Sequence, residues 1–258
     1  MEDRISISSM IDAGDALREA EAEKAAAIHY SFLPDSFSNN FLDIAVHSQP
    51  FGKIGGDFCS IFPVDAKRLI LCMCDATGHD VASALFAARI NTHVLTHAAD
   101  IKHPCILIDT LNRFLCHRLS HTGIYASLFT IFIDMEQASM DYAGAGHPPA
   151  LHYQASAGKI DMLQSETTFL GIDHPLLVSC SMNRRCLAAG DRIVLYTDGI
   201  SEAVDRQGRM FGAHGIKRVV NDHHNSSSED LNNAIVNELM RGNYAIGDDI
   251  MLMSVSIK

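Results

Sequence analysis

The sequence predicts an α+β fold: a sandwich of two mainly antiparallel β-sheets flanked by α-helices, with a further helix at the N-terminus. Many short apolar segments are separated by turns of Gly, Pro, Asp and Asn, which is typical of antiparallel strands. The helical segments come in two pairs rather than one after each strand, which argues against a doubly wound parallel sheet. The chain has 258 residues, 47% of them apolar, enough for one substantial core.

The first element is a helix predicted over residues 9 to 33. Ser9 and Asp12 are typical of a helix start, and Pro34 is expected to end the helix. Its apolar stripe is narrow and is interrupted by Lys24, which is thin for a core helix. We therefore expect residues 1–34 to form a dimerisation or signal-relay helix and residues 35–258 to form the main domain. The alternative is a helix packed on the side of that domain.

The remaining elements follow from periodicity. Helical spacing predicts helices over about 79–98, 104–120, 212–222 and 228–241, with Pro104 suited to a first helical turn. Alternating or continuous apolar runs predict strands over 41–46, 58–63, 68–75, 125–134, 140–145, 149–153, 159–163, 177–182, 191–198 and 250–257.

Composition narrows the classes of function. The formal charge is 20 − 31 = −11, which does not suit a nucleic-acid partner. No apolar run approaches the roughly 20 residues of a membrane span. Seven scattered cysteines suggest reduced thiols in a cytoplasmic protein, or in the cytosolic output domain of a larger sensor.

Four aspartates share one setting, the end of a predicted strand beside a tight turn. They are Asp57, Asp75, Asp198 and Asp248. A single aspartate of this kind is commonly a turn or cap residue. Four of them could converge at one end of the sandwich, where rigid carboxylates reach solvent and suit hard divalent cations.

The motifs around these aspartates resemble a known family. In order, they are Gly55-Gly56-Asp57, Asp75-Ala76-Thr77-Gly78-His79, Ala145-Gly146-His147-Pro148-Pro149, Tyr196-Thr197-Asp198-Gly199 with Glu202, and Gly247-Asp248-Asp249-Ile250. They resemble the metal-dependent protein serine/threonine phosphatases (PPM, type 2C superfamily), in the bacterial branch typified by stage II sporulation protein E and partner-switching stress regulators. The resemblance covers roughly residues 28 to 258.

The resemblance implies a centre of two Mn²⁺ or Mg²⁺ ions. Asp57, Asp75 and the backbone carbonyl of Ala76 would be ligands shared by or adjacent to both ions, and Asp198 and Asp248 the remaining carboxylates. Two ions about 3.5–4 Å apart activate a bridging water that attacks a phosphoserine or phosphothreonine in line. Asp57 and Asp75 would thus act catalytically through the metals, without a protein nucleophile.

Further residues have alternative interpretations. Asp249 is more suited to support the ligands than to bind metal, and Glu202 either hydrogen-bonds metal-bound water or is an ordinary acid. His79 is a general acid or, more simply, a helix-start residue. Asp80 stands where this branch commonly has glycine. It is either a first-turn acid that the helix dipole stabilises, or a residue near the metals that alters their affinity. Cys72 and Cys74 share one strand face without a CxxC pair, so we expect core thiols rather than zinc ligands.

The predicted function is therefore metal-dependent dephosphorylation of a protein. The resemblance implies a phosphorylated STAS-domain protein, an anti-anti-sigma factor or antagonist, as substrate, with a homodimer through the N-terminal helix and an upstream sensor domain as further partners. The alternatives are a non-catalytic partner-binding module on the same fold, or a two-metal hydrolase of small phosphoesters.

Overall fold

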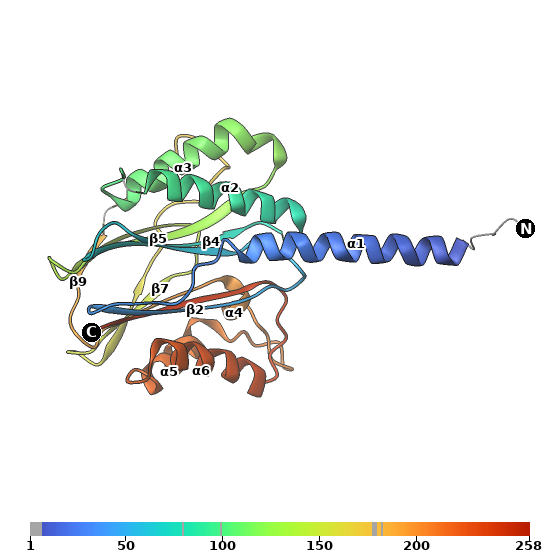
Figure 1. Cartoon of the computed structure of the whole chain (residues 1–258). Coiled ribbons are helices and arrows are strands. Elements are labelled where there is room, and N and C mark those ends of the chain that lie inside the picture. The colour runs from blue at the N-terminus through green and yellow to red at the C-terminus, as the bar shows by residue number, and fades with distance from the viewer. Residues whose placement is uncertain (1–6, 79, 99, 177–179, 182) are drawn as a thin grey trace, which may run out of the picture.

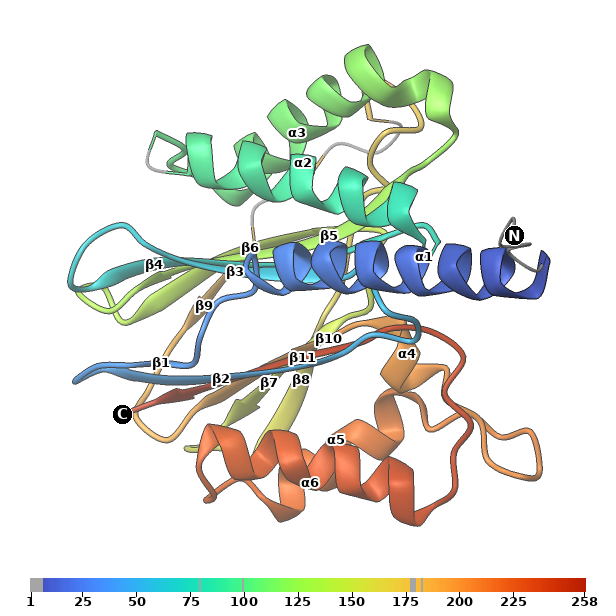
Figure 2. The same ribbon diagram turned by 45° about the vertical axis from the view of Figure 1, so that its right-hand side comes forward.

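Two antiparallel sheets pack face to face and carry helices on their outer faces (Figures 1 and 2). The structure is a computed structural model that describes residues 7–78, 80–98, 100–176, 180–181 and 183–258, with side chains from residue 19. Within that part, one sheet has the order β1-β2-β11-β10-β7-β8 and the other β3-β4-β5-β6-β9. The predicted fold class is confirmed.

The first sheet is built from segments at both ends of the domain. Its strands are β1 (Phe37–Ser38), β2 (Leu42–Gln49), β7 (Ala150–Gln154), β8 (Lys159–Leu163), β10 (Arg192–Tyr196) and β11 (Ile250–Ile257). β11 pairs along its whole length with β2, from Ile250 opposite Gln49 to Ile257 opposite Leu42. Helices α5 (Gly212–Asp222) and α6 (Ser228–Arg241) cover its outer face, and the short α4 (Asp198–Ser201) follows β10.

The second sheet contains β3 (Phe58–Pro63), β4 (Arg68–Ala76), β5 (Ala126–Asp134), β6 (Ser139–Ala145) and β9 (Asn183–Cys186). Helices α2 (Val81–His97) and α3 (Pro104–Leu119) lie on its outer face, and the 3-10 turn Ser120–Thr122 follows α3. Cys72, Cys74 and Ala76 of β4 are buried beneath these helices. Met73 and Leu71 point the other way, into the core between the sheets.

Helix boundaries follow from capping. Asp80 caps α2: its carboxylate accepts the backbone N–H groups of Ala82 and Ser83, and the Ser83 hydroxyl accepts the N–H of Asp80. Pro104 stands in the first turn of α3, as expected. Ser227 caps α6, whose first turn contains Glu229 and Asp230.

Helix α1 (Ile7–Tyr30) projects from the body of the molecule (Figure 1). It begins two residues before the predicted start at residue 9, so Ser9 and Asp12 lie inside the helix and do not cap it. It ends four residues before Pro34. Its last turns contact the domain, since His29 is buried and Lys53 forms an ion pair with Glu19 at 3.0 Å.

One predicted strand is displaced. The expected strand at 177–182 falls partly on residues outside those described, and Cys180 and Ser181 are not in a strand. The edge strand β9 instead begins at Asn183 and pairs with β6. Alternation in the sequence could not separate these neighbouring segments, because the strand NRRC has only half-buried and exposed positions.

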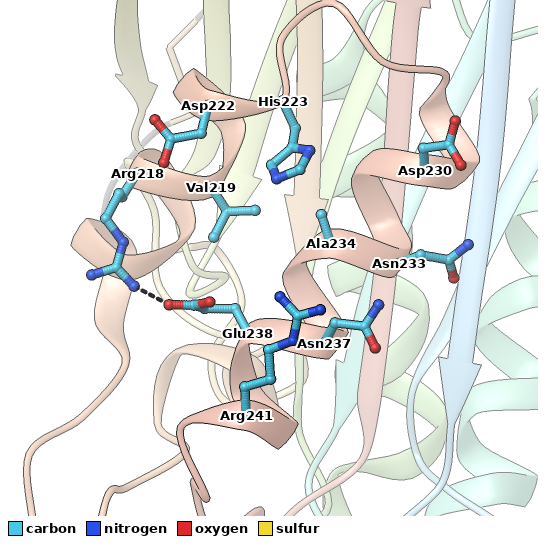
Figure 3. A pocket seen from close by; sticks show the side chains of 10 residues that line it. All are labelled: Arg218, Val219, Asp222, His223, Asp230, Asn233, Ala234, Asn237, Glu238 and Arg241. Carbon is cyan, nitrogen blue, oxygen red and sulfur yellow. Dashed lines mark hydrogen bonds and ion pairs between the residues drawn. The ribbon is translucent and has the colours of Figure 1, made fainter.

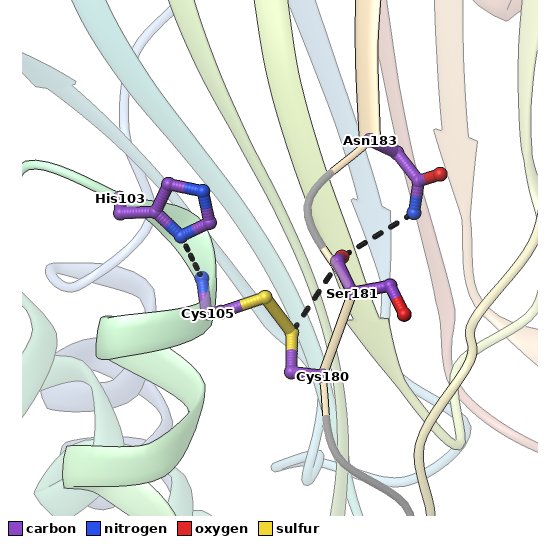
Figure 4. The surroundings of a disulfide bond; sticks show 5 residues. All are labelled: His103, Cys105, Cys180, Ser181 and Asn183. Carbon is purple, nitrogen blue, oxygen red and sulfur yellow. Dashed lines mark hydrogen bonds between the residues drawn. A yellow bond between two sulfur atoms is a disulfide. The ribbon is translucent and has the colours of Figure 1, made fainter.

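The expectation of uniformly reduced cysteines is wrong for one pair. Cys105, in the first turn of α3, forms a disulfide with Cys180, 75 residues further along the chain (Figure 4). The bond ties α3 to the segment that leads into β9. The spacing gave no signal of this pair, because the two sulfur atoms meet only through the packing of the segment on α3. Cys72 and Cys74 are confirmed as core thiols, and burial raises the pKa of Cys72 to about 12.

The disulfide should contribute measurably to stability. Cross-linking residues this far apart restricts the unfolded chain, and such bonds typically contribute about 2–4 kcal/mol. We expect Cys105→Ser to lower the melting temperature of oxidised protein by several degrees, and dithiothreitol to bring the wild type to the same value. Cys186→Ser, at an exposed free thiol, is the matched control. Equal melting temperatures of the wild type with and without reductant would contradict this role.

Candidate metal centre

The four predicted ligands come from both sheets. Asp57 directly precedes β3 and Asp75 is the penultimate residue of β4, so these two belong to neighbouring strands of one sheet. Asp198 begins α4 just after β10, and Asp248 lies two residues before β11, the neighbour of β10 in the other sheet. The centre therefore lies at one end of the sandwich.

The carboxylates are close enough to influence one another's ionisation. Burial raises the pKa of Asp57 well above its ordinary value, and the negative charges of Asp75, Asp249 and Asp198 raise it further. Burial and the charges of Asp198, Asp248 and Asp249 raise the pKa of Asp75 to about 7. Burial and the charges of Asp248 and Glu202 raise the pKa of Asp198 to about 6. The sequence-predicted ligands thus form one electrostatic cluster.

Asp57 has a side-chain oxygen that needs a partner. The residue is 5% exposed, and its Oδ2 atom is buried without a hydrogen bond. A side-chain hydrogen bond with Thr197 lowers the pKa of Asp57 only in part. An unpaired buried carboxylate oxygen among other carboxylates is unfavourable without a counter-charge. This is the observation that fits a divalent cation.

The donor set also fits hard cations. It consists of carboxylate oxygens and the carbonyl of Ala76, which suit Mg²⁺ and Mn²⁺ rather than soft metals. Among the described residues, no three His, Cys, Asp or Glu side chains are arranged to hold one ion by themselves. Waters, backbone carbonyls and substrate oxygens commonly complete the coordination of Mg²⁺.

Asp249 holds the loop that carries Asp57. Its Oδ1 accepts the N–H of Phe51 at 2.7 Å, and its Oδ2 accepts the N–H of Gly56 at 2.8 Å. Asp249 itself is 3% exposed. Both carboxylate oxygens are therefore engaged with backbone, which agrees with the expectation that Asp249 supports the ligands.

The glycines of the motifs make room for this arrangement. A Cβ on Gly55 would lie 2.2 Å from the Asp249 carboxylate, and one on Gly199 would lie 2.0 Å from the Asp249 carbonyl oxygen. A Cβ on Gly56 would lie 2.4 Å from the carbonyl oxygen of Ala76. The four segments around residues 55–56, 76, 199 and 249 can approach one another so closely only because these three positions have no side chain.

The remaining predicted residues have distinct positions. Glu202 is exposed, its N–H donates to the Asp198 carbonyl at 2.7 Å, and its charge contributes to the raised pKa of Asp198. Asp80 is the N-cap of α2 rather than a residue of its first turn, at the end of the helix where the dipole favours a negative charge. His79 lies outside the described residues. His147 is buried beside Phe129, and burial lowers its pKa to about 4.

Sequence reasoning missed the role of Thr197. Its hydroxyl accepts the N–H of Met251 at 2.9 Å, and its own N–H donates to the Met251 carbonyl at 3.0 Å. These bonds join the end of β10 to the start of β11, next to Asp198 and Asp248. Its position directly before Asp198 was the only signal in the sequence.

The surface also contains a polar groove between α5 and α6 with a volume of about 390 Å³ (Figure 3). Arg218 on α5 forms an ion pair with Glu238 on α6 across it. None of the predicted metal-site residues lines this groove, so its charges do not contribute to the carboxylate cluster.

The fold is shared with phosphatase domains of type PP2C. It aligns with the SiaA-PP2C domain of Pseudomonas aeruginosa at a TM-score of 0.82 and 19% identity, over 95% of this chain and 99% of that one. It aligns with the PP2C phosphatase domain and a regulatory fragment of SpoIIE from Bacillus subtilis at a TM-score of 0.73 and 19% identity, over 87% of this chain and 64% of that one.

Sequence comparison then identifies the family. The model of the stage II sporulation protein E (SpoIIE) family matches residues 65–258, and the chain belongs to this family. The phosphoserine phosphatases RsbU and RsbP of Bacillus subtilis (strain 168) are 23% and 24% identical, over 91% and 92% of this chain. The chain spans 69% of RsbU and 58% of RsbP. PP2C phosphatases are metal-dependent, and RsbX, which shares the fold at a TM-score of 0.65, 17% identity, and 86% and 98% coverage of this and that chain, was crystallised with magnesium.

The raised pKa values predict that the metal-free site destabilises the protein at alkaline pH. A carboxyl whose pKa is higher in the folded than in the unfolded state stabilises the fold below about pH 4 and loses that contribution as pH rises through its folded value. Asp75, with a pKa of about 7, loses it by pH 8. We therefore expect Asp75→Asn to raise the melting temperature of metal-free protein at pH 8 by about 3 °C or more, and much less at pH 5. Thermal melts in EDTA check this. Asp65→Asn is the control with the opposite expected sign, because hydrogen bonds lower the pKa of Asp65. A lower melting temperature for Asp75→Asn at pH 8 would contradict the repulsion.

Proposed function

We propose that this chain is a protein serine/threonine phosphatase that uses two Mn²⁺ or Mg²⁺ ions held by Asp57, Asp75, the Ala76 carbonyl, Asp198 and Asp248. The observation that carries the proposal is the electrostatic cluster itself. Carboxylates from two sheets raise one another's pKa, and a buried oxygen of Asp57 lacks a partner. Membership of the SpoIIE family supports the same assignment.

The chemistry follows from the placement of the residues. Bound ions would lower the pKa of a coordinated water and neutralise charge on the phosphoryl oxygens. Asp57 and Asp75 sit on adjacent strands and present their oxygens from a rigid sheet end. Asp249 keeps the Asp57 loop in place through Phe51 and Gly56. The shared fold and exposed Asp248 leave the site open to a protein surface.

We infer a phosphorylated STAS-domain protein as the substrate, acting in a partner-switching pathway. The support is similarity to RsbU and RsbP, which are named phosphoserine phosphatases. A structure solved in a study of the bacterial stressosome also shares the fold, at a TM-score of 0.60 and 17% identity. No helix of the described chain is long and apolar enough to cross a membrane. We propose a cytoplasmic location, as a free protein or the output domain of a larger sensor.

Two alternative functions would use the same fold or the same metal site. A non-catalytic binding module would keep the fold without turnover, and a hydrolase of small phosphoesters would keep the metals without protein specificity. The cluster of all four aspartates favours a working metal centre. Turnover on an intact phosphoprotein, a phosphopeptide and nucleotides, together with calorimetric titration of Mn²⁺, separates the three.

Asp198→Asn should abolish Mn²⁺-dependent dephosphorylation of a phosphoserine protein. Removing a carboxylate from the centre weakens metal binding and misplaces the reactive water, so we expect a loss of at least about 100-fold in kcat/KM. Release of inorganic phosphate from a phosphorylated STAS-domain protein is the measurement. Asp222→Asn, on α5 and outside the cluster, is the control. Full activity of Asp198→Asn would refute the assignment of the site.

We further propose that residues 1–34 are a dimerisation or relay element and residues 35–258 the phosphatase domain. Helix α1 projects from the body (Figure 1), and Ile28 is 60% exposed on its last turns. Helices that expose apolar side chains in this way commonly pack against a second helix.

Sedimentation should therefore show a dimer of the full chain and a monomer after deletion of residues 1–24, which leaves the buried His29 in place. Circular dichroism of both forms checks that the deletion leaves the domain folded. A full chain that sediments only as a monomer at all concentrations would contradict the dimer.

A further inference from the structure

Two aromatic residues lie beside the metal centre and have no part in it. In the β4–β5 pairing, Asp75 is opposite Ser127 and Ala76 is opposite Ala126. The pairing continues for one residue, because the N–H and hydroxyl of Thr77 both donate to the carbonyl of Tyr125, at 3.0 and 2.7 Å. Tyr125 is therefore two residue positions, about 7 Å along the strand, from Asp75.

Phe169 reaches the same place from another segment. Leu170 forms a bridge with Ala126, with a 2.8 Å hydrogen bond from its N–H to the Ala126 carbonyl. The rings of Tyr125 and Phe169 meet edge to face, with centroids 5.3 Å apart. Their spacing is that of a favourable aromatic pair.

The pair faces the same side of the sheet as Asp75. Side chains alternate between the two faces of paired strands. Ile124, Ala126 and Ala76 pack into the core beneath α2 and α3. Tyr125 and Asp75, which alternate with them, therefore point away from these helices, and the ring contact brings Phe169 to the same side.

The Phe169 ring is held in position before any ligand arrives. Gly146 has a φ of 64°, and a Cβ there would lie 2.7 Å from the ring. The adjoining chain is fixed by a hydrogen bond from the Ser165 hydroxyl to the His147 carbonyl at 2.7 Å and by one from the Gly146 N–H to the Thr167 carbonyl at 2.9 Å. The Ala-Gly-His-Pro motif thus supports the aromatic pair.

Despite this support, both residues remain partly exposed to solvent. Tyr125 is 37% exposed and Phe169 is 39% exposed. Single exposed apolar residues are ordinary, whereas a rigid aromatic pair beside a reactive centre is the kind of anchor that dominates binding energy at protein interfaces. The negative charges of the nearby carboxylate cluster disfavour a ligand with acidic side chains at the same place.

We propose that Tyr125 and Phe169 form a specificity platform that binds an apolar side chain one or two residues from the phosphorylated Ser or Thr of a protein substrate. This inference rests on the proposed phosphatase function. An extended peptide advances about 3.3 Å per residue, so two residues cover the interval of about 7 Å between Asp75 and Tyr125. The platform selects substrates by contact with the residue beside the phosphate, while the aspartates act on the phosphate itself.

A matched pair of phosphopeptides tests the platform. They differ only at the positions one and two residues from the phosphoserine, with Leu in one peptide and Ser in the other. We expect wild-type protein with Mn²⁺ to favour the Leu peptide by about tenfold in kcat/KM, the range of one well-bound apolar group. Tyr125→Ala and Phe169→Ala should bring this ratio close to one, and Phe169→Leu should restore part of it. Tyr125→Ala keeps the backbone carbonyl that Thr77 uses.

Met240→Ala removes a side chain that is 48% exposed on α6 and should leave the ratio at the wild-type value. An unchanged ratio in both aromatic variants, or an equal loss on both peptides, would overturn the platform. Wild-type protein that hydrolyses neither of these peptides nor an intact phosphoserine protein would instead refute the phosphatase function. In that case, fluorescence anisotropy with the same labelled peptides still tests the platform, which requires tighter binding of the Leu peptide and loss of that preference in the aromatic variants.

Discussion

The arrangement of the proposed metal-binding residues depends on one carboxylate that is not itself a predicted ligand. Asp249 begins the approach to β11 in one sheet and accepts two backbone N–H groups from the loop that leads to β3 in the other. A charged acceptor for two backbone donors is among the stronger hydrogen-bond arrangements in proteins. Through it the position of Asp57 in the second sheet is set by the end of the first sheet. Gly55 leaves room for this side chain, and Gly199 leaves room for the backbone of the same residue.

The second constraint is that the site is built from charges of one sign. Burial and mutual repulsion raise the pKa values of Asp57, Asp75 and Asp198 together. The fold tolerates this because the strands that carry these residues are anchored in the core, with Met73, Leu195 and Met253 fully buried between the sheets. The repulsion at the site is thus offset by stability elsewhere in the sandwich, and a bound cation would reduce it.

Much of the fold and of the candidate site can be predicted from the amino-acid sequence. The predicted bounds are correct for the strands at 58–63 and 250–257 and for the helices at 212–222 and 228–241, because the apolar periodicity of these segments is clear. The aspartates were predicted from strand-end motifs, and their convergence is an outcome of sheet order that no single motif encodes. The start of α1 was misplaced because Ser9 and Asp12 look like caps although the helix begins earlier. The Cys105–Cys180 bond and the meeting of Tyr125 with Phe169 depend on how one long connection packs, which spacing does not reveal.

The order of the strands has a consequence for how the protein folds during its synthesis. Gly56 and Asp249, which hydrogen-bond each other, are 193 residues apart, and β11 completes its sheet by pairing with β2. Contacts between such distant segments form late, since the chain between them must first be closed into a loop. During synthesis, the carboxylate cluster can therefore assemble only after the ribosome has released the residues of β11. A nascent or truncated chain that ends before residue 248 contains Asp57 and Asp75 but not Asp248 and Asp249, so it can form neither the carboxylate cluster nor the hydrogen bonds that Asp249 accepts.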